Sequence, residues 1–307
     1  MSRPVTIAAA QYPIEALADW AAYEAKISQW VAAAAAQGAD LAVFPEYGAM
    51  ELASLDPATM GDLAGSLASV AALAPRVAAL HAGLARAHGL HILAASLPVA
   101  EGGVYVNRAC LYTPAGQVGH QDKQVMTRFE NEQWHVAPGG ALRVFATDLG
   151  RIAIAICYDS EFPLIARACV EAGAELLLVP SCTDSHHGYW RVRIGAQARA
   201  LEGQMFVVQS PTVGDAPWSP AVDENRGAAA IYAPSDGVAL GLGLPADGVV
   251  AIGALDAAQW VVGRVDLAAV AMLRAGGGVL NARDWACQKG AAPLPPVELV
   301  DLRSPRP

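Results

Sequence analysis

Short apolar runs alternate with longer alanine-rich stretches along most of this chain. Runs such as Leu41–Phe44 and Leu176–Val179 contain no polar residue, a pattern typical of strands that are buried on both faces. The alanine-rich stretches are longer and end at helix-stop signals, as Trp20–Gln37 does at Gly38. The pattern predicts an α/β protein in which strands and helices alternate.

The same pattern gives the expected elements one by one. We expect strands at Val5–Ala10, Leu41–Phe44, His91–Leu97, Tyr105–Thr113, Arg151–Ile156, Leu176–Val179, Phe206–Gln209, Gly227–Tyr232 and Val249–Leu255. Helices are expected at Trp20–Gln37, at Leu63–His88 with an interruption near Pro75, at Phe162–Ala172 and at Tyr189–Glu202. No linker divides the chain, so one domain over residues 1–285 is predicted, followed by a proline-rich C-terminal tail at 286–307.

Two pairs of segments resemble each other. Gly38–Glu46 is similar to Gly173–Ser181, and Val5–Tyr12 aligns with Arg151–Tyr158. Such pairs fit two similar strand–helix halves that face each other, although short apolar strands also look alike by chance. Two stacked sheets flanked by helices would account for the buried, nearly continuous apolar strands.

Charge and cysteine usage restrict the class of protein. The formal net charge is −9 with no basic cluster, which disfavours partners such as nucleic acid or an anionic membrane surface. The first residues lack the layout of a signal peptide, and no uncharged apolar run approaches the roughly 18–20 residues that span a bilayer. The five cysteines are widely spaced without a Cys-x-x-Cys motif, which is typical of reduced thiols. We therefore expect a soluble cytoplasmic protein without a metal site.

Cys157 is the most informative candidate for chemistry. It ends the apolar run that begins at Arg151, and the helix-starting residues Asp159, Ser160 and Pro163 follow at once. A thiol at a strand-to-helix junction lies near free backbone N–H groups and the positive end of a helix dipole. Both favour the thiolate, so we expect a nucleophile with an activated thiol.

Three further motifs accompany this cysteine. They are Phe44-Pro45-Glu46, Asp122-Lys123, and Glu132 shortly before Pro138-Gly139. In the order Glu, Lys, Glu, Cys, this chain resembles the nitrilase superfamily of carbon–nitrogen hydrolases. Arg199-Ala200-Leu201-Glu202 and Gly227–Pro234 resemble later structural motifs of that family. The resemblance extends from about residue 5 to about residue 285 and implies a four-layer α-β-β-α sandwich.

The resemblance also implies a mechanism. Cys157 would attack an amide or nitrile carbon, and Glu46 would take the thiol proton and later activate water. Lys123 would stabilise the oxyanion together with the backbone N–H of Tyr158. Glu132 would hold Lys123 or the water in place. No organic cofactor or metal is implied, and members of the family commonly pair through helices such as Phe162–Ala172 and Tyr189–Glu202, so a homodimer or larger homo-oligomer is expected.

Candidate substrate-binding residues lie beside these motifs: Tyr47, Trp134, Tyr158, Glu161 and Asp184. Some family members that act on carbamoylated amino acids have an arginine at the position of Glu161, where it grips a carboxylate. A glutamate there disfavours a substrate carboxylate and favours a neutral or amine-bearing substrate; it also complements a helix N-terminus.

Three readings of function stay open. The first is a cofactor-free thiol amidase acting on an amide or a carbamoyl group of a small molecule, with nitrile hydrolysis as the alternative on the same scaffold. The second is a non-catalytic relative that serves binding or assembly. The third is a Cys–His protease, for which only His135 and the pair His186-His187 are placed to act as base, without a local signature.

Overall fold

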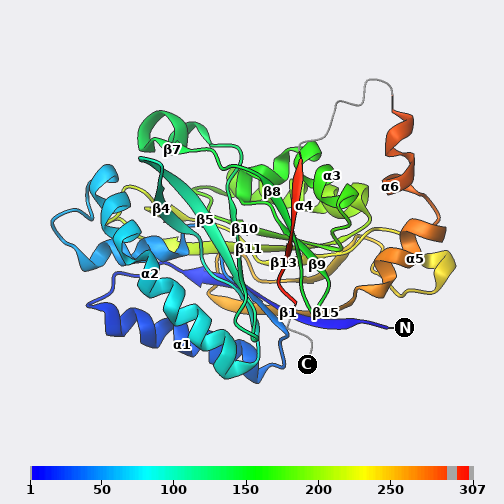
Figure 1. Cartoon of the computed structure of the whole chain (residues 1–307), viewed down its shortest axis with the longest axis horizontal. Coiled ribbons are helices and arrows are strands. Elements are labelled where there is room, and N and C mark those ends of the chain that lie inside the picture. Colours follow the sequence, from blue (N-terminus) through cyan, green and yellow to red (C-terminus); the bar gives the residue numbers. More distant parts are fainter. Residues whose placement is uncertain (1, 289–295, 304–307) are drawn as a thin grey trace.

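The computed structural model describes residues 2–288 and 296–303, and Figure 1 shows strands enclosed between helices. The strands are β1 (Pro4–Pro13), β2 (Leu41–Val43), β3 (His91–Leu93), β4 (Leu97–Glu101), β5 (Val104–Tyr112), β6 (Val118–Asp122), β7 (Val136–Ala137), β8 (Leu142–Ala146), β9 (Arg151–Ile154), β10 (Leu176–Ser181), β11 (Phe206–Asp215), β12 (Glu224–Asn225), β13 (Ala230–Tyr232), β14 (Val249–Ile252), β15 (Gln259–Asp266) and β16 (Val297–Asp301). The helices are α1 (Trp20–Ala36), α2 (Leu63–His88), α3 (Pro163–Glu171), α4 (His186–Gly203), α5 (Ala268–Gly276) and α6 (Asn281–Asp284).

The strands form one mixed sheet that divides into two halves. Its order is β16-β8-β9-β10-β11-β1-β2-β3-β5-β4, with β15 also paired to β1. β1 pairs with β15 from Pro4 to Gln11 and with β2 from Ile7 to Ala9, and only Tyr12 and Pro13 pair with β11. The sheet therefore changes direction at the end of β1, which joins one half around β1–β5 to the other around β8–β11.

The two halves stack face to face. This follows from β1, whose alternate residues point into two different cores. Val5, Ile7 and Ala9 of β1 pack with β9–β11 in a core between the half-sheets. Ala8 and Ala10 face the other way, onto α1 and α2. α3 and α4 cover the opposite half-sheet (Figure 1). This confirms the predicted four-layer α-β-β-α architecture.

The internal resemblance is visible in the hydrogen bonds. Asp40 N donates to Thr6 O, and the Asp40 carboxylate accepts from Thr6 N. Glu175 makes the same two bonds with Arg151. These matching bonds make Thr6 the counterpart of Arg151, so Tyr12, not Gln11, is the counterpart of Cys157. The sequence alignment was thus wrong by one residue.

Helix α2 continues through Pro75, where an interruption was predicted. A proline in a helix interior costs about 3 kcal/mol, and Val70 and Val77 on either side of it are buried against the sheet. Their packing offsets the local cost. By length and composition alone α2 also suffices to cross a membrane, a test that the core helix of a soluble protein passes as well.

Other differences lie in the strands. The run predicted as His91–Leu97 divides into β3 and β4. β7, β8, β12, β15 and β16 were not predicted. β16 falls in the predicted C-terminal tail, yet it pairs in parallel with β8, and Leu302 beside it is buried. These residues of the tail therefore take part in the sheet, while positions 289–295 and 304–307 lie outside the described residues.

Candidate active site

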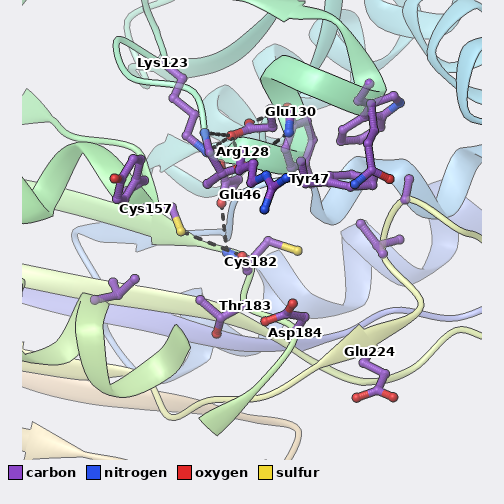
Figure 2. Close-up of a pocket in the computed structure, with 18 of the residues that line it drawn as sticks. Glu46, Tyr47, Lys123, Arg128, Glu130, Cys157, Cys182, Thr183, Asp184 and Glu224 are labelled. Atoms are coloured by element: carbon purple, nitrogen blue, oxygen red, sulfur yellow. Dashed lines mark hydrogen bonds and ion pairs between the residues drawn. The ribbon is translucent and has the colours of Figure 1, made fainter. Parts of the chain in front are cut away.

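Three predicted catalytic side chains meet where their strands end. Glu46 follows β2, Lys123 follows β6 and Cys157 follows β9, and each is almost completely buried. Figure 2 shows these residues directed toward one another at the floor of a pocket. Glu46 comes from the half-sheet of β2 and Cys157 from the half-sheet of β9, so the stacking of the two half-sheets brings together residues that are far apart in sequence.

Cys157 stands on a left-handed backbone. Its φ is +49°, a conformation that costs a residue with a Cβ on the order of 1–2 kcal/mol. The turn Cys157–Glu161 holds it: Ser160 Oγ donates to Cys157 O at 2.7 Å, and Ile156 N donates to the Asp159 carboxylate at 3.2 Å. The sharp turn lifts the thiol out of the strand, where its Sγ donates to Cys182 O at 3.7 Å.

Glu46 is held by three donors from different segments. Lys123 Nζ and Asn107 Nδ2 donate to Oε1 at 2.8 and 2.9 Å, and Cys182 N donates to Oε2 at 3.0 Å. Asn107 and the backbone of Cys182 were not among the predicted residues. They fix the orientation of the carboxylate before any substrate arrives, so that little reorganisation is needed.

The second glutamate of the site is Glu130, so the prediction of Glu132 was wrong. Lys123 Nζ donates to Glu130 Oε2 at 2.6 Å, and Tyr47 OH donates to Glu130 Oε1 at 2.9 Å. Glu132 lies outside, 53% exposed, and pairs with Arg128 at 2.8 Å. The π-helical turn Glu130–Trp134 directs the two side chains in different directions.

A sequence signal for Glu130 did exist. Thr127 N and Oγ1 each donate to Glu130 Oε2 at 2.9 Å, and Glu130 N donates to Thr127 Oγ1 at 3.3 Å. This reciprocal pair is a capping box, whose spacing is Ser/Thr-x-x-Glu. Thr127 stands three residues before Glu130, and no such partner stands before Glu132.

The charges of this cluster depend on one another. Burial acts to lower the pKa of Lys123, but the Glu130 and Glu46 carboxylates raise it well above its usual value, so the ammonium stays charged. Burial acts to raise the pKa of Glu130, yet Lys123 and Thr127 hold that pKa below its ordinary value. Burial prevails at Glu46, whose pKa is raised although Lys123 opposes the shift. Glu46 is therefore the better proton acceptor of the two carboxylates.

The thiol of Cys157 is kept protonated, contrary to the prediction of a thiolate. Burial, and then the negative charge of Glu46, raise the pKa of Cys157 well above its ordinary value, and Lys123 offsets this only in part. The first α-helical turn starts at Pro163, beyond the short turn that carries the thiol. The arrangement therefore needs a base at the moment of attack, and Glu46 is in place to act as one.

Asp159 joins the two loops that carry Lys123 and Cys157. Its carboxylate accepts from Val125 N at 2.8 Å and Gln124 N at 3.1 Å, besides Ile156 N. Burial raises the pKa of Asp159 to about 7, although Lys123 and these backbone donors oppose the shift. Asp159 thus fixes the position of the Cys157 loop relative to the Lys123 loop.

A cavity of about 480 Å³ opens above this cluster. All five predicted substrate-binding residues line it: Tyr47, Trp134, Tyr158, Glu161 and Asp184. The rings of Tyr47 and Trp134 lie with centroids 4.7 Å apart and form an aromatic wall. A cavity of this size, with aromatic walls and convergent polar groups at its floor, suits a small organic molecule.

Histidines do not enter this cavity. His186 pairs with Asp256 at 2.7 Å, and neither it, His187 nor His135 lines the cavity wall. Within residues 2–288 and 296–303, no group of three or more His, Cys, Asp and Glu side chains is arranged to hold a metal ion. The site therefore has a thiol with a carboxylate beside it, not a Cys–His pair.

A fold of two stacked half-sheets with a buried Glu–Lys–Glu–Cys cluster defines the class of protein, and comparison with known families agrees. The family model described as carbon-nitrogen hydrolase matches residues 6–263. The chain belongs to the carbon–nitrogen hydrolase family, as its resemblance to the nitrilase superfamily implied.

Individual relatives cover most of this chain. "Probable hydrolase YhcX" of Bacillus subtilis is 33% identical over 281 residues, which are 92% of this chain and 53% of that protein. The chain therefore spans about half the length of this curated relative. A carbon-nitrogen hydrolase from Helicobacter pylori G27 has the same fold, with a TM-score of 0.70 and 16% identity over 94% of this chain and 95% of that chain.

An amidase from Nesterenkonia sp. also shares the fold. Its TM-score is 0.65 and its identity 21%, with 88% of this chain and 93% of that chain covered. In a mutant of that amidase, the acetamide moiety of fluoroacetamide is covalently added at the active-site cysteine.

Proposed function

We propose that this protein hydrolyses a non-peptide C–N bond, that of an amide in a small molecule, through a thioester on Cys157. The observation that carries the proposal is the burial of Cys157, Glu46, Lys123 and Glu130 together at the floor of one cavity. Burying such an ion-pair cluster carries a desolvation cost, and buried, mutually perturbed charged groups in a cavity are typical of functional sites. The cysteine adduct of the Nesterenkonia amidase supports the first requirement of this chemistry, a nucleophilic cysteine.

In the first half of the reaction, Cys157 Sγ attacks the amide carbon while Glu46 takes the thiol proton. The carbonyl oxygen gains negative charge in the tetrahedral intermediate, and Lys123 Nζ with the backbone N–H of Tyr158 stabilises it. Glu46 then gives its proton to the leaving nitrogen. The C–N bond breaks, ammonia or an amine leaves, and an acyl thioester remains on Cys157.

In the second half, Glu46 takes a proton from water and the resulting hydroxide attacks the thioester carbon. The tetrahedral intermediate collapses, the C–S bond breaks, and Glu46 returns its proton to the sulfur. Because the pKa of Glu46 is raised by burial, its carboxylate is a stronger base than an exposed one, and its protonated form persists long enough to act as an acid. Glu130 keeps Lys123 charged throughout.

Intact-mass spectrometry with ammonia detection tests the proposal. Wild type and Cys157→Ala are incubated with a panel of amides, nitriles and carbamoyl compounds. We expect ammonia and a substrate-sized mass increase from wild type, and neither from Cys157→Ala. Turnover by Cys157→Ala would refute the thioester mechanism.

The panel also separates the alternatives. If nitriles release ammonia and amides do not, the reaction of these residues is nitrile hydrolysis and the proposal of amide hydrolysis is wrong. If only carbamoyl compounds are hydrolysed, the group that Cys157 carries in the intermediate is a carbamoyl group. Absence of both adduct and ammonia, together with an unreactive Cys157 thiol, would favour a non-catalytic binding protein.

We further propose that the protein is a cytoplasmic homodimer. The five cysteines are free thiols, which favours a reducing compartment. The exposed face of α4 carries Trp190, Ile194 and Leu201, which are 49%, 62% and 43% exposed. Apolar side chains at this spacing form a stripe that suits contact with a second copy of the chain.

A further inference from the structure

Charge is unevenly distributed over the wall of the active-site cavity. Above the Glu46–Lys123–Glu130 cluster, the lining includes four carboxylates and two guanidinium groups. They are Glu161, Asp184, Asp223 and Glu224, and Arg128 and Arg191. This excess of negative charge bears on which substrates the cavity accepts.

Both arginines already face a carboxylate. Arg128 Nε lies 2.8 Å from Glu132, and Arg191 Nε lies 3.5 Å from Glu161. A substrate carboxylate would have to compete with these glutamates for either guanidinium. The arginines are also the more exposed partners, at 86% and 60%, so solvent screens them.

Three carboxylates remain with little compensation: Asp184, Asp223 and Glu224, which we name the acidic wall. Arg226 N donates to Thr183 O at 2.9 Å, and Thr183 Oγ1 donates to Arg226 O at 2.7 Å. The segment that carries Asp184 therefore lies beside the segment that carries Asp223 and Glu224. Arg226 pairs with Asp215 at 2.6 Å and reaches Glu224 only at 3.9 Å. Within residues 2–288 and 296–303, neither Asp184 nor Asp223 forms an ion pair.

The acidic wall belongs to the same cavity as the nucleophile. Asp184 follows Cys182 by two residues, and Cys182 N holds Glu46 Oε2 while Cys182 O accepts from Cys157 Sγ. Figure 2 shows Asp184 and Glu224 on the side of the pocket that lies beyond Cys182. A substrate that acylates Cys157 and reaches past Cys182 would meet these carboxylates. The rings of Tyr47 and Trp134 suit the apolar part of such a molecule and tolerate a cation.

We propose that the substrate is an amide with a protonated amine at the end distant from the reacting carbonyl, and that the acidic wall binds this ammonium. This inference rests on the proposed amide hydrolysis and specifies its substrate class. The ammonium gains from three carboxylates, whereas a carboxylate in the same place meets like charge. Glu161 does not bind the ammonium, because Arg191 offsets its charge.

Three amides that share one spacer test the proposal: 6-aminohexanamide, heptanamide and the monoamide of pimelic acid. They end in an ammonium, a methyl group and a carboxylate. We expect kcat/KM for 6-aminohexanamide to exceed that for heptanamide about tenfold at low salt, the sum of three exposed charge interactions. The ratio should fall as ionic strength rises, and the monoamide of pimelic acid should be the poorest substrate.

A charge-neutralised variant assigns the effect to the acidic wall. In the combined variant Asp184→Asn, Asp223→Asn, Glu224→Gln, the ratio of kcat/KM for 6-aminohexanamide to kcat/KM for heptanamide should approach one. Glu24→Gln, which removes an exposed charge from α1 far from the cavity lining, should leave the ratio at its wild-type value. Equal or better hydrolysis of heptanamide by wild type, or an unchanged ratio in the combined variant, would overturn the proposal.

Binding to Cys157→Ala separates this proposal from the proposed function. Calorimetric titration of that variant measures the preference for 6-aminohexanamide without any chemistry. Selective binding of the amine with no turnover by wild type would refute amide hydrolysis and retain the acidic wall as an ammonium site. Turnover without amine preference would retain amide hydrolysis and refute the acidic wall. Neither turnover nor selective binding would refute both.

Discussion

At the scale of single residues, the site depends on a few side chains whose charges are set by burial and by one another. The sequence was sufficient to place Glu46, Lys123 and Cys157 in one site, because each stands within three residues of a strand end inside a recognisable motif. The prediction of Glu132 was wrong, because two glutamates stand two positions apart and only the geometry of the π-helical turn decides which side chain points inward. Asn107 escaped notice because its contact with Glu46 joins residues 61 positions apart.

The two glutamates form a matched pair for mutation. We expect Glu130→Gln to lower kcat/KM about a hundredfold or more, because it removes a buried charge that keeps Lys123 ionised and oriented. Glu132→Gln removes only an exposed partner of Arg128 and should change kcat/KM less than about twofold. Steady-state kinetics on one amide substrate gives both values. Equal losses in the two variants would contradict the assignment of Glu130.

At the scale of elements, buried strands and amphipathic helices were predictable from local periodicity, and α2 was predicted with the bounds that it has. What periodicity does not reveal is pairing over long distances. β15 runs antiparallel to β1 more than 240 residues away in sequence, and β16 adds to β8 from beyond a proline-rich stretch. Such strands are stabilised by pairing with distant strands, and the local sequence pattern does not indicate which strand is the partner.

One buried side chain couples α2 to the sheet and makes stability depend on pH. His81 is fully buried, its Nδ1 donates to Val77 O at 2.9 Å, and its ring stacks on Tyr112 of β5. Burial lowers the pKa of His81 to about 4, although Val77 O opposes the shift. The unfolded chain therefore binds a proton more readily, and the stability that neutral His81 contributes is present above about pH 6.5 and is lost as pH falls toward 4.

We accordingly expect wild type to lose about 2–3 kcal/mol of unfolding free energy between pH 7 and pH 4.5 through this residue. His81→Phe should lack that part of the loss, since phenylalanine fills similar space without titrating. His88→Phe, at the exposed C-terminal end of the same helix, is the control and should follow wild type. Urea denaturation at the two pH values measures the difference. An identical pH dependence in all three proteins would argue against His81 as the cause.

At the scale of the whole molecule, two similar halves meet along β1 and β11 and bring their strand ends to one site. Glu46 comes from one half and Cys157 from the other, so the catalytic cluster forms only when both halves pack. The repeated bonds of Asp40 and Glu175 at the start of each half anchor corresponding strands in the same register. The sequence resemblance between the halves indicated this arrangement, but the exact register required the hydrogen bonds.

The helical layer over Cys157 links assembly to the site. α4 packs on the turn that carries Cys157: Arg199 Nη1 donates to Ser160 O at 3.1 Å, and a Cβ at Gly195 would lie only 3.0 Å from that same carbonyl oxygen. On its outer face, Ile194 is the most exposed residue of the apolar stripe. If two copies pair through this stripe, the contact steadies the helix on which the nucleophile turn rests.

Ile194→Glu tests that arrangement. A buried charge without a partner is costly at an apolar contact, so this variant should be a monomer where wild type is a dimer in multi-angle light scattering. Val104→Glu introduces the same charge at another exposed apolar position, in β5, and should remain dimeric. Because α4 supports the turn of Cys157, the Ile194→Glu monomer should also alkylate at Cys157 at a changed rate, whereas Val104→Glu should not. A wild-type monomer would instead mean that the site is held by the fold of one chain alone.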